Sequence, residues 1–109
     1  MTKTAQLAVS RGLAELTKGT NVTVNAVLPG PTRSEGAEGF VEHLGKQQNK
    51  LKGQVEKEFF QSARPTSLLQ RFASTDEIAN LIVYVASPLS SATNGAALRV
   101  DGGVVKLVI

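Results

Sequence analysis

Two short runs of apolar and β-branched residues predict two strands, at residues 22–27 and 96–100. Both alternating faces of the first run contain valine, which is typical of a strand that helices cover on both sides. A helix-forming segment separates the two runs, so the connection is a crossover and the strands must pair in parallel. The pattern therefore predicts an α/β fold.

Apolar residues recur at helical spacing in two longer segments, residues 1–18 and residues 75–86. The second segment follows Ser74, which together with Glu77 forms the pattern of a capping box. This helix is apolar nearly all round, so we expect it to be covered on more than one side. Its tyrosine, Tyr84, is interpreted as a packed core ring.

The region between these elements, residues 35–73, is polar and weakly periodic, and we call it the middle segment. Ser34 can cap a first helix there, and a second helical stretch surrounds residues 54–62. Its glycines are costly in helices, so we interpret the middle segment as a mobile flap or substrate loop rather than core. Its amides are then expected to be the least protected from exchange. The chain as a whole is expected to form a single domain over residues 1–109.

The sequence Pro29-Gly30-Pro31 ends the first predicted strand. Neither proline has the amide hydrogen that would extend a ladder, and Gly30 permits a sharp turn. In an open parallel sheet, ligands bind just beyond the carboxyl ends of strands. The polar residues that follow are therefore candidates for a site: Thr32, Arg33 and Ser34.

The composition fits a small globular protein, with 41% hydrophobic and 19% charged residues among 109. The chain has no cysteine, which excludes disulfides and thiolate metal sites, and its single histidine, His43, is interpreted as a surface residue. We find no signal peptide and no apolar run long enough to cross a bilayer, so we expect no membrane partner and a cytoplasmic location. The site is expected to hold no metal.

The net charge of +3 raises the question of a nucleic-acid partner. Lysines between residues 46 and 57 are interleaved with glutamates, and the chain has only five aromatic residues. A solvated helical face explains this pattern better than a nucleic-acid surface. We therefore expect no nucleic-acid partner.

Several segments together resemble one known family. The run Asn-Ala-Val-Leu-Pro-Gly at residues 25–30, the capped helix after Ser74, the Asn94-Gly95 turn and Val-Asp-Gly-Gly at residues 100–103 are similar, in order and spacing, to the C-terminal part of a short-chain dehydrogenase/reductase. The resemblance covers essentially the whole chain. It implies a Rossmann-like, doubly wound parallel sheet and hydride transfer between NAD or NADP and a small carbonyl or alcohol substrate.

The first residues resemble the tail of the family's catalytic Tyr-x-x-x-Lys, with Lys3 as its lysine. The tyrosine would lie two residues before Met1 and is not in this chain. By resemblance, Lys3 is both a catalytic and a cofactor-binding candidate, because the family's lysine lowers the tyrosine pKa and holds the nicotinamide ribose. The alternative is an exposed lysine without a role.

By resemblance, the nicotinamide side of the cofactor site is lined by Pro29, Gly30, Pro31 and Thr32, and Thr32 or Ser34 bonds the carboxamide or pyrophosphate. The alternatives are a turn role for Thr32 and a helix cap for Ser34, and for Asn25 we favour a role in fixing the backbone. The family's glycine-rich phosphate turn has no counterpart here. We therefore expect this chain alone to be inactive and to bind no cofactor tightly.

Two hypotheses follow from the sequence. The first is a truncated oxidoreductase of this family, and the alternative is a non-catalytic module for binding or self-assembly. Two strands leave an exposed sheet edge, and the apolar helices exceed what those strands can cover. Both hypotheses therefore predict a homo-oligomer, with a two-fold dimer as the simplest form.

Overall fold

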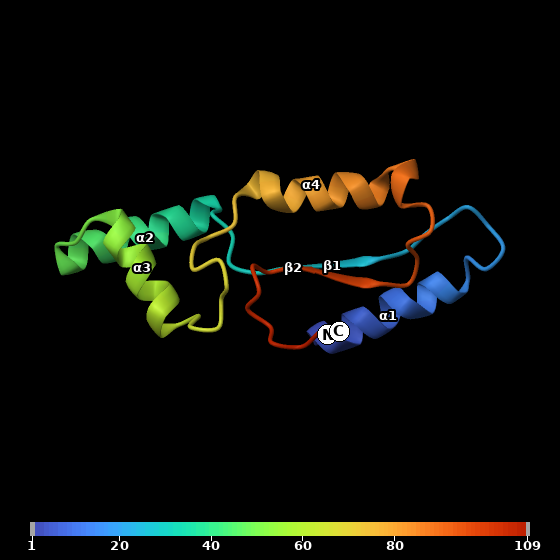
Figure 1. Cartoon of the computed structure of the whole chain (residues 1–109), viewed down its shortest axis with the longest axis horizontal. Helices are drawn as coiled ribbons and strands as arrows, with labels where there is room; N and C mark the ends of the chain where they lie inside the picture. The colour runs from blue at the N-terminus through green and yellow to red at the C-terminus, as the bar shows by residue number, and fades with distance from the viewer. Residues whose placement is uncertain (1, 109) are drawn as a thin grey trace. The chain divides into compact units, whose positions relative to one another are not determined.

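The structure is a computed structural model that describes residues 2–108. Met1 and Ile109, which belong to the predicted first helix and to the apolar end of the chain, lie outside the described residues. Figure 1 shows the elements in chain order: α1 (Lys3–Glu15), β1 (Ala26–Pro29), α2 (Glu35–Gln48), α3 (Lys52–Ser62), α4 (Thr75–Ala86), the 3-10 helix η1 (Pro88–Ser90) and β2 (Ala97–Val100). The described residues form two compact units, one of residues 2–28 and 79–99, the other of residues 29–78 and 100–108.

β1 and β2 form a two-stranded parallel sheet. The amide of Ala26 donates to the Ala96 carbonyl at 2.9 Å, and the amide of Gly30 donates to the Val100 carbonyl at 3.3 Å. The two bonds have the same sequence offset, as parallel pairing requires. The predicted α/β class and parallel pairing are therefore confirmed.

The first strand begins later than the predicted residue 22, because the chain before Ala26 bonds to a turn instead of a strand. The Val24 amide donates to Oδ1 of Asn94 at 2.9 Å, and its carbonyl accepts from the Gly95 amide at 2.9 Å. These bonds satisfy the backbone before the ladder starts. The ladder itself is therefore confined to the four residues of β1.

The first unit places α1 on one side of the two strands and α4 on the other (Figure 1). Thr2 caps α1, because its hydroxyl oxygen accepts from the Ala5 amide at 3.2 Å. Ala14 is the buried residue of this helix, and Leu13 remains 51% exposed. The first predicted helix is thus present, but it buries little.

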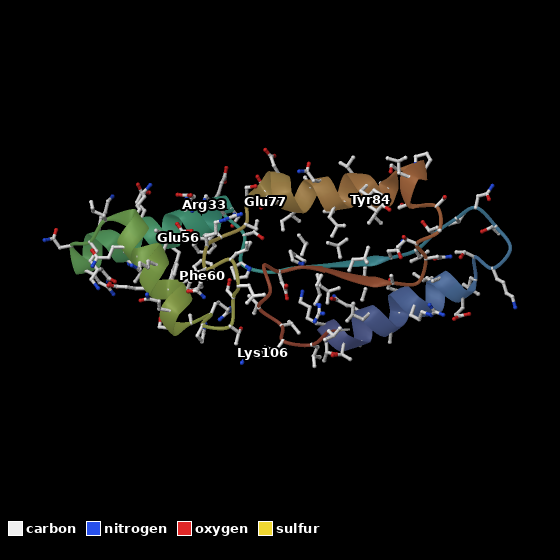
Figure 2. The ribbon with its side chains drawn as sticks, viewed as in Figure 1. Arg33, Glu56, Phe60, Glu77, Tyr84 and Lys106 are labelled. Carbon is white, nitrogen blue, oxygen red and sulfur yellow. The ribbon has the colours of Figure 1, made fainter. Side chains whose placement is uncertain are left out.

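The predicted capping box starts α4. Oγ of Ser74 accepts from the Glu77 amide at 3.1 Å, and the Ser74 amide donates to the Glu77 carboxylate at 2.9 Å. The expectation that α4 is covered on more than one side is wrong for the described chain, because none of its residues is buried. Tyr84, which Figure 2 labels on α4, is 45% exposed, so the prediction of a packed core ring is also wrong.

The second unit contains the main buried cluster, formed by Val41, Val55, Phe60 and Phe72. Phe60 is fully buried, and its ring meets that of Phe72 edge to face with centroids 5.1 Å apart. All four residues lie in the middle segment, so the expectation that this segment contributes little to the core is wrong. The side chains that form the cluster come from α2, α3 and the loop before α4, and the weak periodicity of each helix does not reveal their combination.

None of the helices in the described part of the chain is both long and apolar enough to cross a membrane.

Candidate cofactor site

The loop that leaves β1, residues 29–34, passes very close to the turn that leaves β2. A Cβ atom on Gly30 would lie 2.7 Å from Cα of Asp101 and 2.8 Å from its carbonyl oxygen. Glycine is therefore required at this position because the neighbouring backbone leaves no room for a side chain. The Asp101 carboxylate accepts from the amides of Gly103 and Val105, at 3.0 and 3.2 Å, and thereby holds this turn.

Two hydroxyl groups follow in the same loop, and each already has one partner within the chain. Oγ1 of Thr32 donates to the Gly30 carbonyl at 2.9 Å, and Oγ of Ser34 accepts from the Ala37 amide at 3.3 Å. The cap role of Ser34 is thereby confirmed, with Ser34 as N-cap of α2. Thr32 keeps acceptor capacity and Ser34 keeps its hydroxyl hydrogen, so each can still bond one polar group of a ligand.

The loop is fixed from the other side by the chain that leads into α4. The Arg33 amide donates to the Ala73 carbonyl at 2.8 Å, and the Ala73 amide donates to the Pro31 carbonyl at 2.9 Å. Thr32 and Ala73 form an isolated parallel bridge. Because residue 73 ends the middle segment, these bonds join its two ends.

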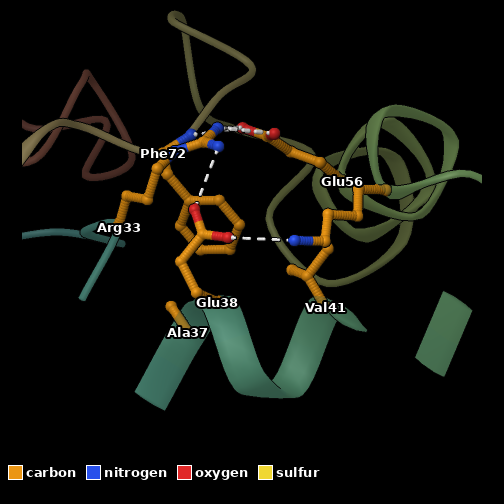
Figure 3. A pocket seen from close by; sticks show the side chains of 7 residues that line it. Arg33, Ala37, Glu38, Val41, Glu56 and Phe72 are labelled. Carbon is orange, nitrogen blue, oxygen red and sulfur yellow. Dashed lines mark hydrogen bonds and ion pairs between the residues drawn. The ribbon is translucent and has the colours of Figure 1, made fainter. Parts of the chain in front are cut away.

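An ion-pair network lies beside the loop (Figure 3). Nη2 of Arg33 donates to both oxygens of Glu56, at 2.8 and 2.7 Å, and Nη1 donates to Glu38 at 3.2 Å. The same Glu56 carboxylate accepts from the Phe72 amide at 3.1 Å. The hydrogen bond to Glu56 is the main reason why the pKa of Arg33 is raised above its ordinary value.

These side chains close around a cavity of about 20 Å³, which has room for about one water molecule and not for a substrate. Its lining residues are Arg33, Ala37, Glu38, Val41, Lys52, Glu56 and Phe72. The cavity is therefore part of the packing of the middle segment.

A second guanidinium–carboxylate pair holds the start of α4. Nη1 of Arg71 donates to Glu77 at 2.8 Å. This bond, together with the Ser74 amide, lowers the pKa of Glu77 to about 2. Glu77 is thus engaged by the cap and by Arg71, in agreement with its predicted cap role.

The remaining candidates lie elsewhere. Lys3 is the exposed first residue of α1 and belongs to the other compact unit. His43 is exposed on α2, as predicted for a surface residue. Among residues 2–108, no cluster of three or more histidine, cysteine, aspartate or glutamate side chains is arranged to hold a metal ion.

Two asparagines hold the backbone that leads into the strands. Asn25 donates from Nδ2 to the Thr93 carbonyl at 2.9 Å and accepts at Oδ1 from the Ala96 amide at 3.1 Å, which confirms its predicted backbone role. Asn94 was predicted only as a turn residue. It also donates from Nδ2 to the hydroxyl of Thr17 at 2.8 Å, and thereby links the strands to the end of α1. No local sequence signal identifies that contact.

The remaining donors and acceptors of residues 29–34 could hold an amide group, such as the carboxamide at one end of a dinucleotide cofactor. A nicotinamide carboxamide carries one acceptor and two donor hydrogens, which match the remaining capacity of Ser34 and Thr32. The described residues offer no glycine-rich turn between a strand and a helix for the pyrophosphate. The fit is therefore to the nicotinamide end alone.

Comparisons with known proteins give one consistent result. The family model described as Enoyl-(Acyl carrier protein) reductase matches residues 1–105. The uncharacterized oxidoreductases YvrD and YvaG of Bacillus subtilis are 50% and 51% identical over 97% and 98% of the chain, which spans 40% of the length of each. The crystal structure of L-sorbose reductase from Gluconobacter frateurii, complexed with NADPH and L-sorbose, superposes with a TM-score of 0.83 at 26% identity, over 97% of this chain and 39% of that one.

The chain thus spans about 40% of the length of the curated relatives that it matches. The matching region includes both strands and every helix of the described structure. The resemblance seen in the sequence is confirmed by these matches, and so is the relation of the fold to the Rossmann-like sheets of such enzymes. The chain belongs to the short-chain dehydrogenase/reductase family.

Proposed function

We propose that this chain is the carboxyl-terminal part of an NAD(P)-dependent oxidoreductase that transfers hydride between nicotinamide and a carbonyl or alcohol substrate. The observation that carries the proposal is the loop of residues 29–34, which presents two hydroxyl groups at the carboxyl end of β1. The NADPH named with the L-sorbose reductase structure supports the choice of cofactor class.

The residues of this chain have separate roles in the proposal. The nicotinamide, when bound, supplies the hydride. Pro29, Gly30 and Pro31 shape the wall beside it, and Thr32 and Ser34 orient its carboxamide through their remaining hydrogen-bonding capacity. Lys3 holds the nicotinamide ribose and, next to the family's tyrosine, favours the charged form of that tyrosine.

The chain alone is expected to be inactive, because neither the family's proton-donating tyrosine nor its phosphate turn is among its 109 residues. With NADH or NADPH and a carbonyl substrate, we expect no consumption of reduced cofactor. Calorimetric titration should give a dissociation constant no tighter than about 1 mM, which corresponds to about 4 kcal/mol. A micromolar dissociation constant, or turnover above the buffer rate, would show that the proposal is wrong for this chain.

We further propose that the chain self-associates through α4. We also propose that it functions in the cytoplasm, and the absence of cysteine is compatible with that location. The specific observation is that three apolar or aromatic residues of α4, Ile82, Val83 and Tyr84, are 49%, 66% and 45% exposed. Contact between the same helix of two copies would give a two-fold dimer.

Light scattering of the folded chain at tens of micromolar should return at least twice the monomer mass of 11.5 kDa. Val83→Lys should shift the population toward monomer, because a charge placed in an apolar interface is costly to desolvate. Lys57→Ala, on α3, serves as the matched surface change without effect. A monomeric mass for the cooperatively folded, unmodified chain would rule out self-association under these conditions.

A further inference from the structure

One carboxylate, that of Glu56 on α3, bonds to both ends of the middle segment. It accepts from the Arg33 guanidinium, just before the segment begins, and from the Phe72 amide, just before it ends. Figure 3 shows Arg33 and Phe72 together on one side of this carboxylate. The Glu56 side chain is only 17% exposed, so its bonds are partly shielded from water.

The same two ends are joined by backbone bonds between Ala73 and the carbonyl of Pro31 and amide of Arg33. The two ends of the middle segment are therefore paired with each other, and we call residues 31–33 and 72–73 the stem. Glu56 connects this stem to α3, and Glu38 connects it to α2 through its bond to Arg33. Phe72 adds a further connection, because its ring belongs to the buried cluster and lies 5.9 Å from the Arg33 guanidinium carbon.

Arg33 stands between Thr32 and Ser34, the two residues that carry the hydroxyl groups of the candidate site. Its guanidinium is engaged by two carboxylates, Glu56 and Glu38. Its charge is therefore largely balanced within the chain, and this disfavours a direct role in binding a phosphate. The bonds to Glu56 instead hold Arg33 in a fixed position relative to α3.

We propose that Arg33 and Glu56 are positioning residues, which set the conformation of residues 29–34 by tying this loop to α3. The proposal rests on the proposed function only because that function gives residues 29–34 a role in cofactor binding. Neither residue needs to touch the cofactor or the reacting atoms. The loop and the middle segment then act as one unit, so that loss of the Arg33–Glu56 pair loosens the hydroxyl groups without unfolding the buried cluster.

Amide hydrogen exchange of the chain without any ligand tests this inference directly. Glu56→Gln keeps the shape of the side chain and removes its charge. We expect exchange at Arg33, Phe72 and Ala73 to become about tenfold faster, since a charge-assisted bond is weakened. Exchange at Val55 and Phe60, in the buried part of α3, should stay within about twofold.

Glu58→Gln is the matched control, because Glu58 lies on the same helix and pairs with Lys50 at 2.7 Å without touching the loop. It should leave exchange at Arg33 and Ala73 unchanged. A second test compares Arg33→Ala with Arg33→Lys, of which only the lysine variant should retain part of the protection. Unchanged exchange in Glu56→Gln, an equal effect of Glu58→Gln, or uniform acceleration that includes Phe60 would each overturn the inference.

The cofactor role is measured separately, with nicotinamide mononucleotide as the probe. If the probe changes no amide signal in residues 30–34 of the unmodified chain, the proposed function fails while the exchange result still stands. If the probe acts on the loop but Glu56→Gln leaves both the exchange rates and the probe response unchanged, the positioning inference fails by itself. The expected result is a weaker probe response in Glu56→Gln and an unchanged one in Glu58→Gln.

Discussion

Replacing Phe60 with alanine is expected to lower the free energy of unfolding by about 3–5 kcal/mol. Phe60 is fully buried, and its ring meets those of Phe59 and Phe72 with centroids 5.1 Å away in both cases. Alanine would remove a fully buried aromatic side chain and leave a cavity that the surrounding rings cannot fill. The loss should be measured by urea unfolding, monitored by circular dichroism.

Phe40 provides the matched control for this experiment. It lies on α2, is 49% exposed, and its ring centroid is 6.3 Å from that of Phe59. Phe40→Ala should therefore cost only about 1 kcal/mol. Equal losses for the two variants would mean that the buried cluster does not organise the middle segment.

Gly30→Ala is expected to cost about 2–3 kcal/mol, because the added methyl group would overlap the backbone at Asp101. The conflict is with Cα of Asp101 at 2.7 Å, which belongs to the backbone of the turn that leaves β2 and cannot rotate away as a side-chain tip can. Relief requires the strands to separate at the Gly30–Val100 hydrogen bond. Thermal unfolding should show a lowered midpoint, and the Gly30 amide should exchange faster.

Gly39→Ala provides the comparison, because nothing lies within 4 Å of a Cβ atom at this position in α2. Alanine should stabilise the helix there by up to about 1 kcal/mol. The two glycine variants are thus expected to have opposite signs. A Gly30→Ala chain as stable as the unmodified one would contradict the close approach of the two backbones.

The features that the sequence predicts well are those with local signals. The caps at Ser34 and Ser74 require only a hydroxyl placed three residues before an amide, and the structure contains both. The Pro29-Gly30-Pro31 stop and the Asn94-Gly95 turn are equally local, so the end of β1 and the start of β2 lie within two residues of their predicted places. The parallel pairing follows from the helix that separates the strands.

The features that the sequence does not predict depend on residues far apart in the chain. Phe60 and Phe72 meet only because the loop after α3 turns back, and the pair of Arg33 with Glu56 joins residues 23 positions apart. The prediction for Tyr84 is wrong in the opposite sense, because this residue was expected to be buried and is exposed. Its apolar neighbours in the sequence indicate burial, but one side of α4 has no partner in the described chain. The apolar periodicity of a helix indicates which residues it can bury, whereas their actual burial depends on what packs against the helix.

The buried cluster also changes what we expect of the middle segment in solution. The sequence alone favours a mobile flap, with amides that exchange faster than those of other parts. With Val55 and Phe60 buried, we instead expect slow exchange in α3, and fast exchange in the loop that follows α3, where residues 63–65 are exposed. The unmodified chain, which is the reference for Glu56→Gln in the exchange experiment, supplies this measurement.

The central claim, that residues 29–34 form the nicotinamide side of a cofactor site, is tested most directly by NMR titration of the isotope-labelled chain. Nicotinamide mononucleotide, added to about its expected millimolar dissociation constant, should shift the amide signals of Gly30, Thr32 and Ser34. Adenosine monophosphate carries the same phosphate charge without the nicotinamide, and it should leave those three signals in place. Equal shifts with both nucleotides, or no shift at residues 30–34 with nicotinamide mononucleotide, would contradict the account.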